Sequence, residues 1–131
     1  MMKYSFENLE VWQKSRILVQ SIYKLTASFP SDEKYGLSTQ LRRASVSISS
    51  NIAEGSTRWS KKDQARFYEI AFGSLIEVRN QLILSNDLKH IDDKQLNDLR
   101  EQIETIGRML NALHKSQNKP INKSTSQPIN N

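Results

Sequence analysis

The sequence predicts an all-α protein, an antiparallel up-down-up-down four-helix bundle formed by one domain. The length of 131 residues suits a single domain with a sizeable core. Apolar residues recur at spacings of three and four in four segments, whereas strict two-residue alternation is scarce. Only four glycines and three prolines occur, and no Asn-Gly or Asp-Gly pair indicates a hairpin. Short connections between the four segments favour antiparallel neighbours.

The first helix is expected over residues 8–29. One apolar face and an adjacent stripe together form a wide apolar surface. The main face contains Val11, Leu18, Ile22, Leu25 and Phe29, and the second stripe contains Trp12, Val19 and Tyr23. Pro30 ends this helix, because a residue that precedes proline avoids the α conformation.

The second helix is expected to begin between Asp32 and Gly36 and to end at Glu54. Its apolar residues are Leu37, Leu41, Ala44, Ile48 and Ile52. Serines and alanines fill the positions between them, so a neighbouring helix can come close. Because serine has a weak helix propensity, tertiary packing must stabilise this helix. Gly55 suits the left-handed position that follows a helix end.

The third helix is expected from Ser60 to Leu88, with Ser60 and Asp63 forming a capping box at its start. Its middle is apolar on more than one side. One stripe contains Phe67, Ile70, Ala71, Ser74, Val78 and Leu82, and outside this stripe lie Tyr68, Phe72, Leu75, Ile76 and Ile83.

The fourth helix has the most regular pattern, with spacings of three and four in turn. Its apolar residues are Leu96, Leu99, Ile103, Ile106, Leu110 and Leu113. Asp92 or Asp93 is expected to cap its start. The domain is expected over residues 1–115, and the polar, basic residues 116–131 are expected to form a disordered C-terminal tail.

Two helices carry more apolar surface than one subunit is expected to bury. The side chains that are hardest to place in the same core are Trp12, Tyr23, Phe72 and Ile76. Left exposed, they form a patch larger than soluble monomers usually show. We therefore expect a homo-oligomer with these residues at its interface. A thick single core with some exposed aromatic side chains remains the alternative.

Several function classes lack support in the sequence. The chain contains no cysteine, which excludes disulfides and thiolate metal sites. Its two histidines lie at expected helix ends, its acidic residues lack the spacing of a calcium loop, and no nucleophile–base pair or phosphate-binding loop is present. We expect no enzyme activity, no catalytic residue, no metal and no cofactor. Without a signal peptide or a membrane-length apolar run, a cytoplasmic location is the simplest expectation.

Asn51 and Glu54 share one face at the end of the second helix, next to Gly55. A carboxylate near a helix C-terminus opposes the helix dipole, so Glu54 is expected to have a partner. The favoured interpretation is structural: an arginine or backbone groups bind Glu54 and fix this polar corner. A ligand contact is the alternative.

Basic residues gather between positions 41 and 66, where the net charge is +4 and the chain as a whole carries +5. They are Arg42, Arg43, Arg58, Lys61, Lys62 and Arg66, with Trp59 among them. Such a surface can hold the phosphate backbone of RNA or DNA and stack a base. A solvated face with internal ion pairs is equally consistent with the sequence. The alternative function is a protein–protein scaffold or accessory subunit, in which the basic surface serves an acidic protein partner.

A set of spaced motifs resembles the 23S ribosomal RNA intervening-sequence proteins, the bacterial "four helix bundle proteins". The likeness covers about residues 5 to 113. It rests on Leu9-Glu10-Val11-Trp12-Gln13-Lys14, Phe29-Pro30, Glu33-Lys34-Tyr35-Gly36-Leu37, Gln40-Leu41-Arg42-Arg43-Ala44, Asn51-Ile52-Ala53-Glu54-Gly55 and Gly73-Ser74. Ser47, Ser49 and Ser50 replace the proline-containing run that is common before the Asn-Ile-Ala-Glu-Gly block.

The resemblance implies an antiparallel four-helix bundle that assembles into a ring-like homopentamer. Some members of the family are encoded within intervening sequences of ribosomal RNA genes. A related branch, the accessory proteins of diversity-generating retroelements, binds nucleic acid and a reverse transcriptase through a basic surface. The resemblance implies no catalytic residue.

Overall fold

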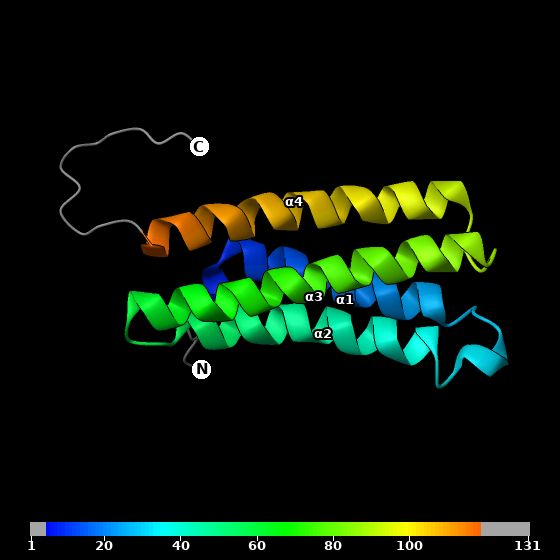
Figure 1. The fold of residues 1–131 in the computed structure, drawn as a ribbon, viewed down its shortest axis with the longest axis horizontal. Coiled ribbons are helices and arrows are strands. Elements are labelled where there is room, and N and C mark those ends of the chain that lie inside the picture. The colour runs from blue at the N-terminus through cyan, green and yellow to red at the C-terminus, as the bar shows by residue number, and fades with distance from the viewer. Residues whose placement is uncertain (1–4, 119–131) are drawn as a thin grey trace.

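The computed structural model describes residues 5–118, which form four long helices joined by short connections and no strand. The helices are α1 (Glu10–Thr26), α2 (Leu37–Ser56), α3 (Lys61–Asp87) and α4 (Asp93–Asn118), and two short 3-10 turns are η1 (Ser5–Asn8) and η2 (Ser31–Glu33). They alternate in direction along the bundle (Figure 1). The all-helical prediction is therefore confirmed.

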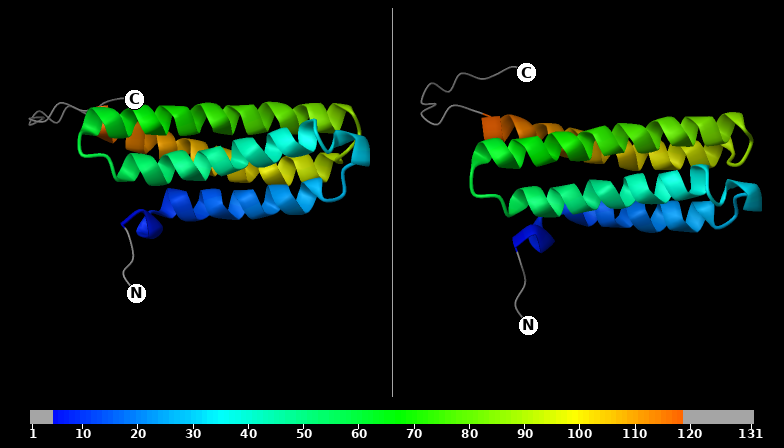
Figure 2. Two further views of the ribbon diagram at one scale, coloured as in Figure 1. Left: turned by 90° about the horizontal axis from the view of Figure 1, so that it is seen from below. Right: turned by 60° about the horizontal axis from the view of Figure 1, so that its bottom comes forward.

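Each helix packs against its neighbours in the chain, and α1 also contacts α4, which closes the bundle. The most extensive contact is between α2 and α3. Figure 2 shows α2 lying alongside both α1 and α3. One end of the bundle thus contains the start of α1, the end of α4 and the α2–α3 connection (Figure 1). We call the α2–α3 connection and the first two turns of α3, residues 57–66, the corner.

The core is formed by apolar side chains from all four helices. Its largest fully buried apolar members are Leu18, Ile22, Leu41, Ile48, Ile52, Leu75, Leu82, Ile106, Leu110 and Val78. Burial of each large side chain contributes about 1.5–3 kcal/mol. The periodic faces predicted for α1, α2 and α4 supply all of these residues except Leu75, Val78 and Leu82, which belong to α3, so those three patterns identified their parts of the core correctly.

The register of α3 differs from the predicted stripe. Tyr68 and Leu75, which were expected outside the stripe, are 3% and 1% exposed, whereas Ile70 is 47% exposed. Phe67 is only partly buried. Because α3 packs between α2 and α4, it buries a wide face, and a helix that is apolar on several sides does not specify the centre of that face.

Gly55 lies inside α2 and not in a left-handed position after it. The helix continues to Ser56, and no described glycine has a positive φ angle. A Cβ atom at Gly55 would lie 2.8 Å from Cβ of Phe67 and 2.9 Å from Cε1 of Tyr68. The glycine therefore allows α2 and α3 to approach closely, and the helix-end prediction was wrong.

Caps define the starts of α3 and α4. The Ser60 hydroxyl accepts a hydrogen bond from the Asp63 N–H at 3.1 Å, as the capping pattern predicted. Asp92 and Gln95 form a reciprocal box, in which each side chain accepts from the other residue's N–H, at 2.8 and 2.9 Å. α4 extends to Asn118 and so includes the first three residues of the expected tail, and the remaining tail residues lie outside the described part.

The apolar residues expected at an oligomer interface divide into two pairs. Trp12 and Phe72 are partly buried and pack against the core of their own subunit, so the expectation that they do not fit there was wrong. Trp12 also forms an edge-to-face pair with Phe6, with 5.0 Å between ring centroids. Tyr23 and Ile76 are 44% and 48% exposed. No helix within residues 5–118 is long and apolar enough to cross a membrane.

At the end of the bundle opposite the corner, Glu33 joins two connections. Its Oε1 atom accepts a hydrogen bond from the N–H of Leu37, the first residue of α2, at 3.0 Å. Its Oε2 atom lies 2.9 Å from Nε2 of His90, in the α3–α4 connection. The Leu37 N–H and the His90 ring hold the pKa of the Glu33 carboxyl below its ordinary value. This carboxylate therefore ties the start of α2 to the α3–α4 connection.

Candidate nucleic-acid interface

The backbone of the corner is held by local hydrogen bonds. The Arg58 N–H donates to the Gly55 carbonyl at 3.1 Å, and the Gln64 side-chain amide donates to the Arg58 carbonyl at 2.9 Å. On the other side of residue 59, Ser60 caps α3 through its hydroxyl. The connection is thus fixed on both sides of Trp59.

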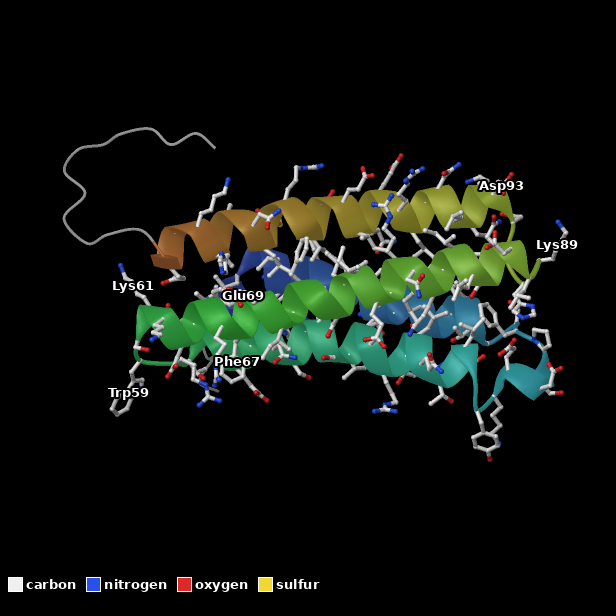
Figure 3. All side chains as sticks on the ribbon, viewed as in Figure 1. Trp59, Lys61, Phe67, Glu69, Lys89 and Asp93 are labelled. Carbon is white, nitrogen blue, oxygen red and sulfur yellow. The ribbon has the colours of Figure 1, made fainter. Side chains whose placement is uncertain are left out.

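Trp59 is fully exposed, at 101% of its reference area. Its ring makes no ring–ring or cation–ring contact within the described residues. Figure 3 shows its side chain pointing away from the bundle at the α2–α3 end. Because tryptophan is highly buried on average in folded proteins, full exposure calls for an explanation beyond packing.

Four exposed cations surround Trp59 in sequence, against one acidic residue, Asp63. They are Arg58, Lys61, Lys62 and Arg66. Within residues 5–118 none of them forms an ion pair. On α4, by contrast, Lys94 pairs with Asp98 and Arg100 with Glu104. The internal ion pairs of the alternative interpretation are therefore absent from the described part of the corner.

Arg58 differs from the other three cations. Its guanidinium lies over the Phe67 ring, 4.4 Å from the ring centroid. This contact anchors the connection to the first turns of α3 and leaves the guanidinium N–H groups free of any ion pair. Arg58 therefore contributes both to the shape of the corner and to its charge.

Arg42 and Arg43 do not belong to the corner. They lie in the first two turns of α2. At a rise of about 1.5 Å per residue, that is about 20 Å along the helix from Ser56, where α2 meets the corner. Arg42 donates from Nε to the Thr26 hydroxyl at 2.8 Å, and its guanidinium lies 4.6 Å from the centroid of the Tyr23 ring. The single basic surface predicted from the sequence is thus divided, and Arg42 joins α2 to α1.

The expected polar corner of Asn51, Glu54 and Gly55 is not formed as predicted. The Asn51 amide donates to the carbonyl and hydroxyl oxygens of Ser47 within its own helix, at 2.8 and 3.1 Å. The Glu54 carboxylate is exposed and forms no hydrogen bond or ion pair with any described residue. Arg58, a candidate partner, stacks on Phe67 instead. The prediction that Glu54 fixes the connection was therefore wrong.

Sequence reasoning missed two histidine–glutamate pairs. His90 lies 2.9 Å from Glu33, and His114 Nε2 lies 2.7 Å from Glu69 Oε2, joining α4 to α3 near the corner end. The partners are separated by 57 and 45 residues. Periodicity carries no signal for such distant pairs. In the described part of the chain, no group of three or more acidic residues and histidines is arranged to hold a metal ion.

Comparisons with known proteins identify the family. The family of the 23S rRNA-intervening sequence protein matches residues 7–112. A solved structure from Bacteroides thetaiotaomicron, described as a protein of unknown function from the S23 ribosomal protein family, is 24% identical, with a TM-score of 0.73 over 80% of this chain and 98% of that chain. That likeness shows the shared fold, and no curated protein matches. Because the family match spans most of the sequence, this chain belongs to the 23S rRNA-intervening sequence protein family.

Proposed function

We propose that this chain is a non-enzymatic helical bundle that binds RNA, or another nucleic acid, through phosphate contacts at the corner. The observation that carries the proposal is the group of exposed cations without ion pairs, Arg58, Lys61, Lys62 and Arg66. Cations of this kind bind phosphates and release the counterions condensed on the nucleic acid, which favours binding of any sequence.

We further propose that the bundle is a homo-oligomer. Exposed apolar side chains on α3 support this: Ile70, Ile76, Ile83 and Leu84 are each at least 42% exposed. The resemblance described above implies a ring-like homopentamer. Repetition of the corner around such an assembly raises the affinity for a long RNA, because contacts after the first become intramolecular.

Anisotropy of a fluorescently labelled RNA, titrated at several salt concentrations, tests the proposal. The triple variant K61A/K62A/R66A removes three phosphate-binding cations. Near 0.1 M salt its affinity should fall about 10- to 100-fold, and the negative slope of log K against log salt should become shallower by about 2. The matched control K24A/K34A/K94A removes the same charge from the opposite end of the bundle and should bind like the parent.

Equal losses in the two triple variants would contradict a localised interface. Absence of RNA binding by the parent would contradict the proposed function. In that case a partner captured from nuclease-treated lysate, and lost in K61A/K62A/R66A, would favour the scaffold alternative. Light scattering that gives a monomer mass at micromolar concentration would contradict the proposed oligomer.

A further inference from the structure

We infer that the corner recognises single-stranded nucleic acid, by stacking an unpaired base on Trp59 while the neighbouring cations hold the adjacent phosphates. The inference rests on the proposed nucleic-acid binding and specifies its substrate class. It depends on the full exposure of the Trp59 side chain, a feature that phosphate binding by the cations does not require.

The indole of Trp59 projects from a backbone that local hydrogen bonds hold in place. Its side chain is fully exposed, yet the backbone on either side of it is held by the Gln64 amide and by the Ser60 cap. A tryptophan with a packing role would contact the bundle, whereas this ring makes no ring contact within the described residues. Because the backbone is already ordered, only the side-chain torsions of Trp59 remain to be fixed on binding, which limits the entropic cost.

Three cations follow Trp59 closely in the chain, at the start of α3. Lys61 and Lys62 begin α3 two and three residues after Trp59, and Arg66 lies one turn beyond Lys62 on the same helix face. A strand that stacks a base on Trp59 therefore lies at the positively charged start of α3, where Lys61 points to the other side of the bundle end from Trp59 (Figure 3). The acidic Glu69, which lies further along α3, is paired with His114 of α4.

Stacking on an aromatic side chain requires a base that is not already stacked on both sides. In a duplex the bases are stacked and paired, so insertion of an indole costs unstacking of a base step. In a single strand the base faces are accessible, and one base stacked on an aromatic side chain is worth about 1–3 kcal/mol. Trp59 thus adds affinity for single strands and little for duplexes, while the cations bind both.

The test compares one RNA sequence as a labelled 12-nucleotide single strand and as a duplex with its complement. W59A should weaken single-strand binding about 5- to 150-fold, the range that corresponds to the stacking energy, and leave duplex binding unchanged. W59F should restore part of the loss, and the salt slope should not change, because no phosphate contact is removed. Since Trp59 is fully exposed, circular dichroism of W59A should match the parent.

A second measurement uses the indole itself. Trp12 is the other tryptophan of the chain, so the W12F background reports Trp59 alone. Its fluorescence should be quenched by the single strand and not by the duplex.

The outcomes separate this inference from the proposed function. If W59A binds single strand and duplex like the parent, or weakens both equally, while K61A/K62A/R66A weakens both, stacking is wrong and phosphate binding stands. If the parent binds neither RNA, both the inference and the proposed function fail.

Discussion

The close approach of α2 and α3 at Gly55 gives a prediction whose magnitude follows from the structure. An alanine inside a helix is favoured over glycine by about 1 kcal/mol. At Gly55, however, the new Cβ would meet Cβ of Phe67 at 2.8 Å. Because that atom is bonded directly to the backbone, no rotamer change removes the contact, and α3 must shift. Overpacking of this kind costs about 1–3 kcal/mol.

Gly73 provides the matched control. It lies within α3, and a Cβ there would meet no atom within 4 Å. G73A should therefore stabilise the protein by about 1 kcal/mol, whereas G55A should be neutral to about 2 kcal/mol destabilising. The helix-propensity gain is common to both variants. Their difference in the free energy of unfolding, about 1–3 kcal/mol, thus isolates the cost of the close approach.

Urea unfolding followed by circular dichroism at 222 nm measures this difference. With an m value of about 2 kcal/mol per M, the two midpoints should differ by about 0.5–1.5 M. The chain concentration must be equal in all samples, because an oligomer's apparent stability depends on it. If G55A stabilises the protein as much as G73A, the contact between α2 and α3 at this position is not tight, and the reasoning is refuted.

Three further predictions concern single side chains. Leu37 and His90 lower the pKa of Glu33 in the folded protein. The stability that Glu33 contributes is therefore present above the usual glutamate pKa and is lost as the pH falls through the lowered value. The urea midpoint of E33Q should accordingly depend less on pH between about pH 5 and 3 than that of the parent. S60A removes the cap of α3 and should lower the free energy of unfolding by about 1 kcal/mol in urea titrations. R42A breaks the contacts between α2 and α1 and should also cost about 1 kcal/mol, while RNA affinity measured by anisotropy stays unchanged.

Each of these three has an outcome that contradicts it. A pH profile of E33Q that is parallel to that of the parent shows that another group governs acid unfolding. If S60A is as stable as the parent, the Ser60 cap does not stabilise α3. A loss of RNA affinity in R42A, without a loss of stability, would show that Arg42 contributes to RNA binding.

The sequence predicted elements through periodicity, and it predicted them well where one face alone is apolar. The stripe of α4 and the Ser60 cap were identified because both depend on residues three or four apart. The register of α3 was missed because its apolar residues surround the helix, so Tyr68 and Ile70 fit the pattern equally well. Burial by two neighbouring helices decided between them.

The candidate site was predicted in part. The cluster around Trp59 is contiguous in sequence, so its residues remain together in the structure. Arg42 was assigned to the same surface because the basic residues were grouped by their closeness in the chain, although a 20-residue helix separates its two ends by about 1.5 Å per residue. Gly55 was interpreted as a helix end because the residue that leaves no room for a Cβ there, Phe67, lies in the next helix. Glu33 and His90 meet only through the bundle's topology.

The alternating direction of the four helices has a practical consequence for handling the protein. The first turn of α1 and the last turn of α4 lie at the same end of the bundle as residues 57–66 (Figure 1). An affinity tag or fluorescent fusion joined directly to the first turn of α1 or the last turn of α4 would therefore begin at the same end of the bundle as the surface under study and could obstruct it. The chain lacks cysteine, so one cysteine introduced in η2 at the far end gives a unique attachment point. Immobilisation through that thiol leaves the opposite end of the bundle open to solution.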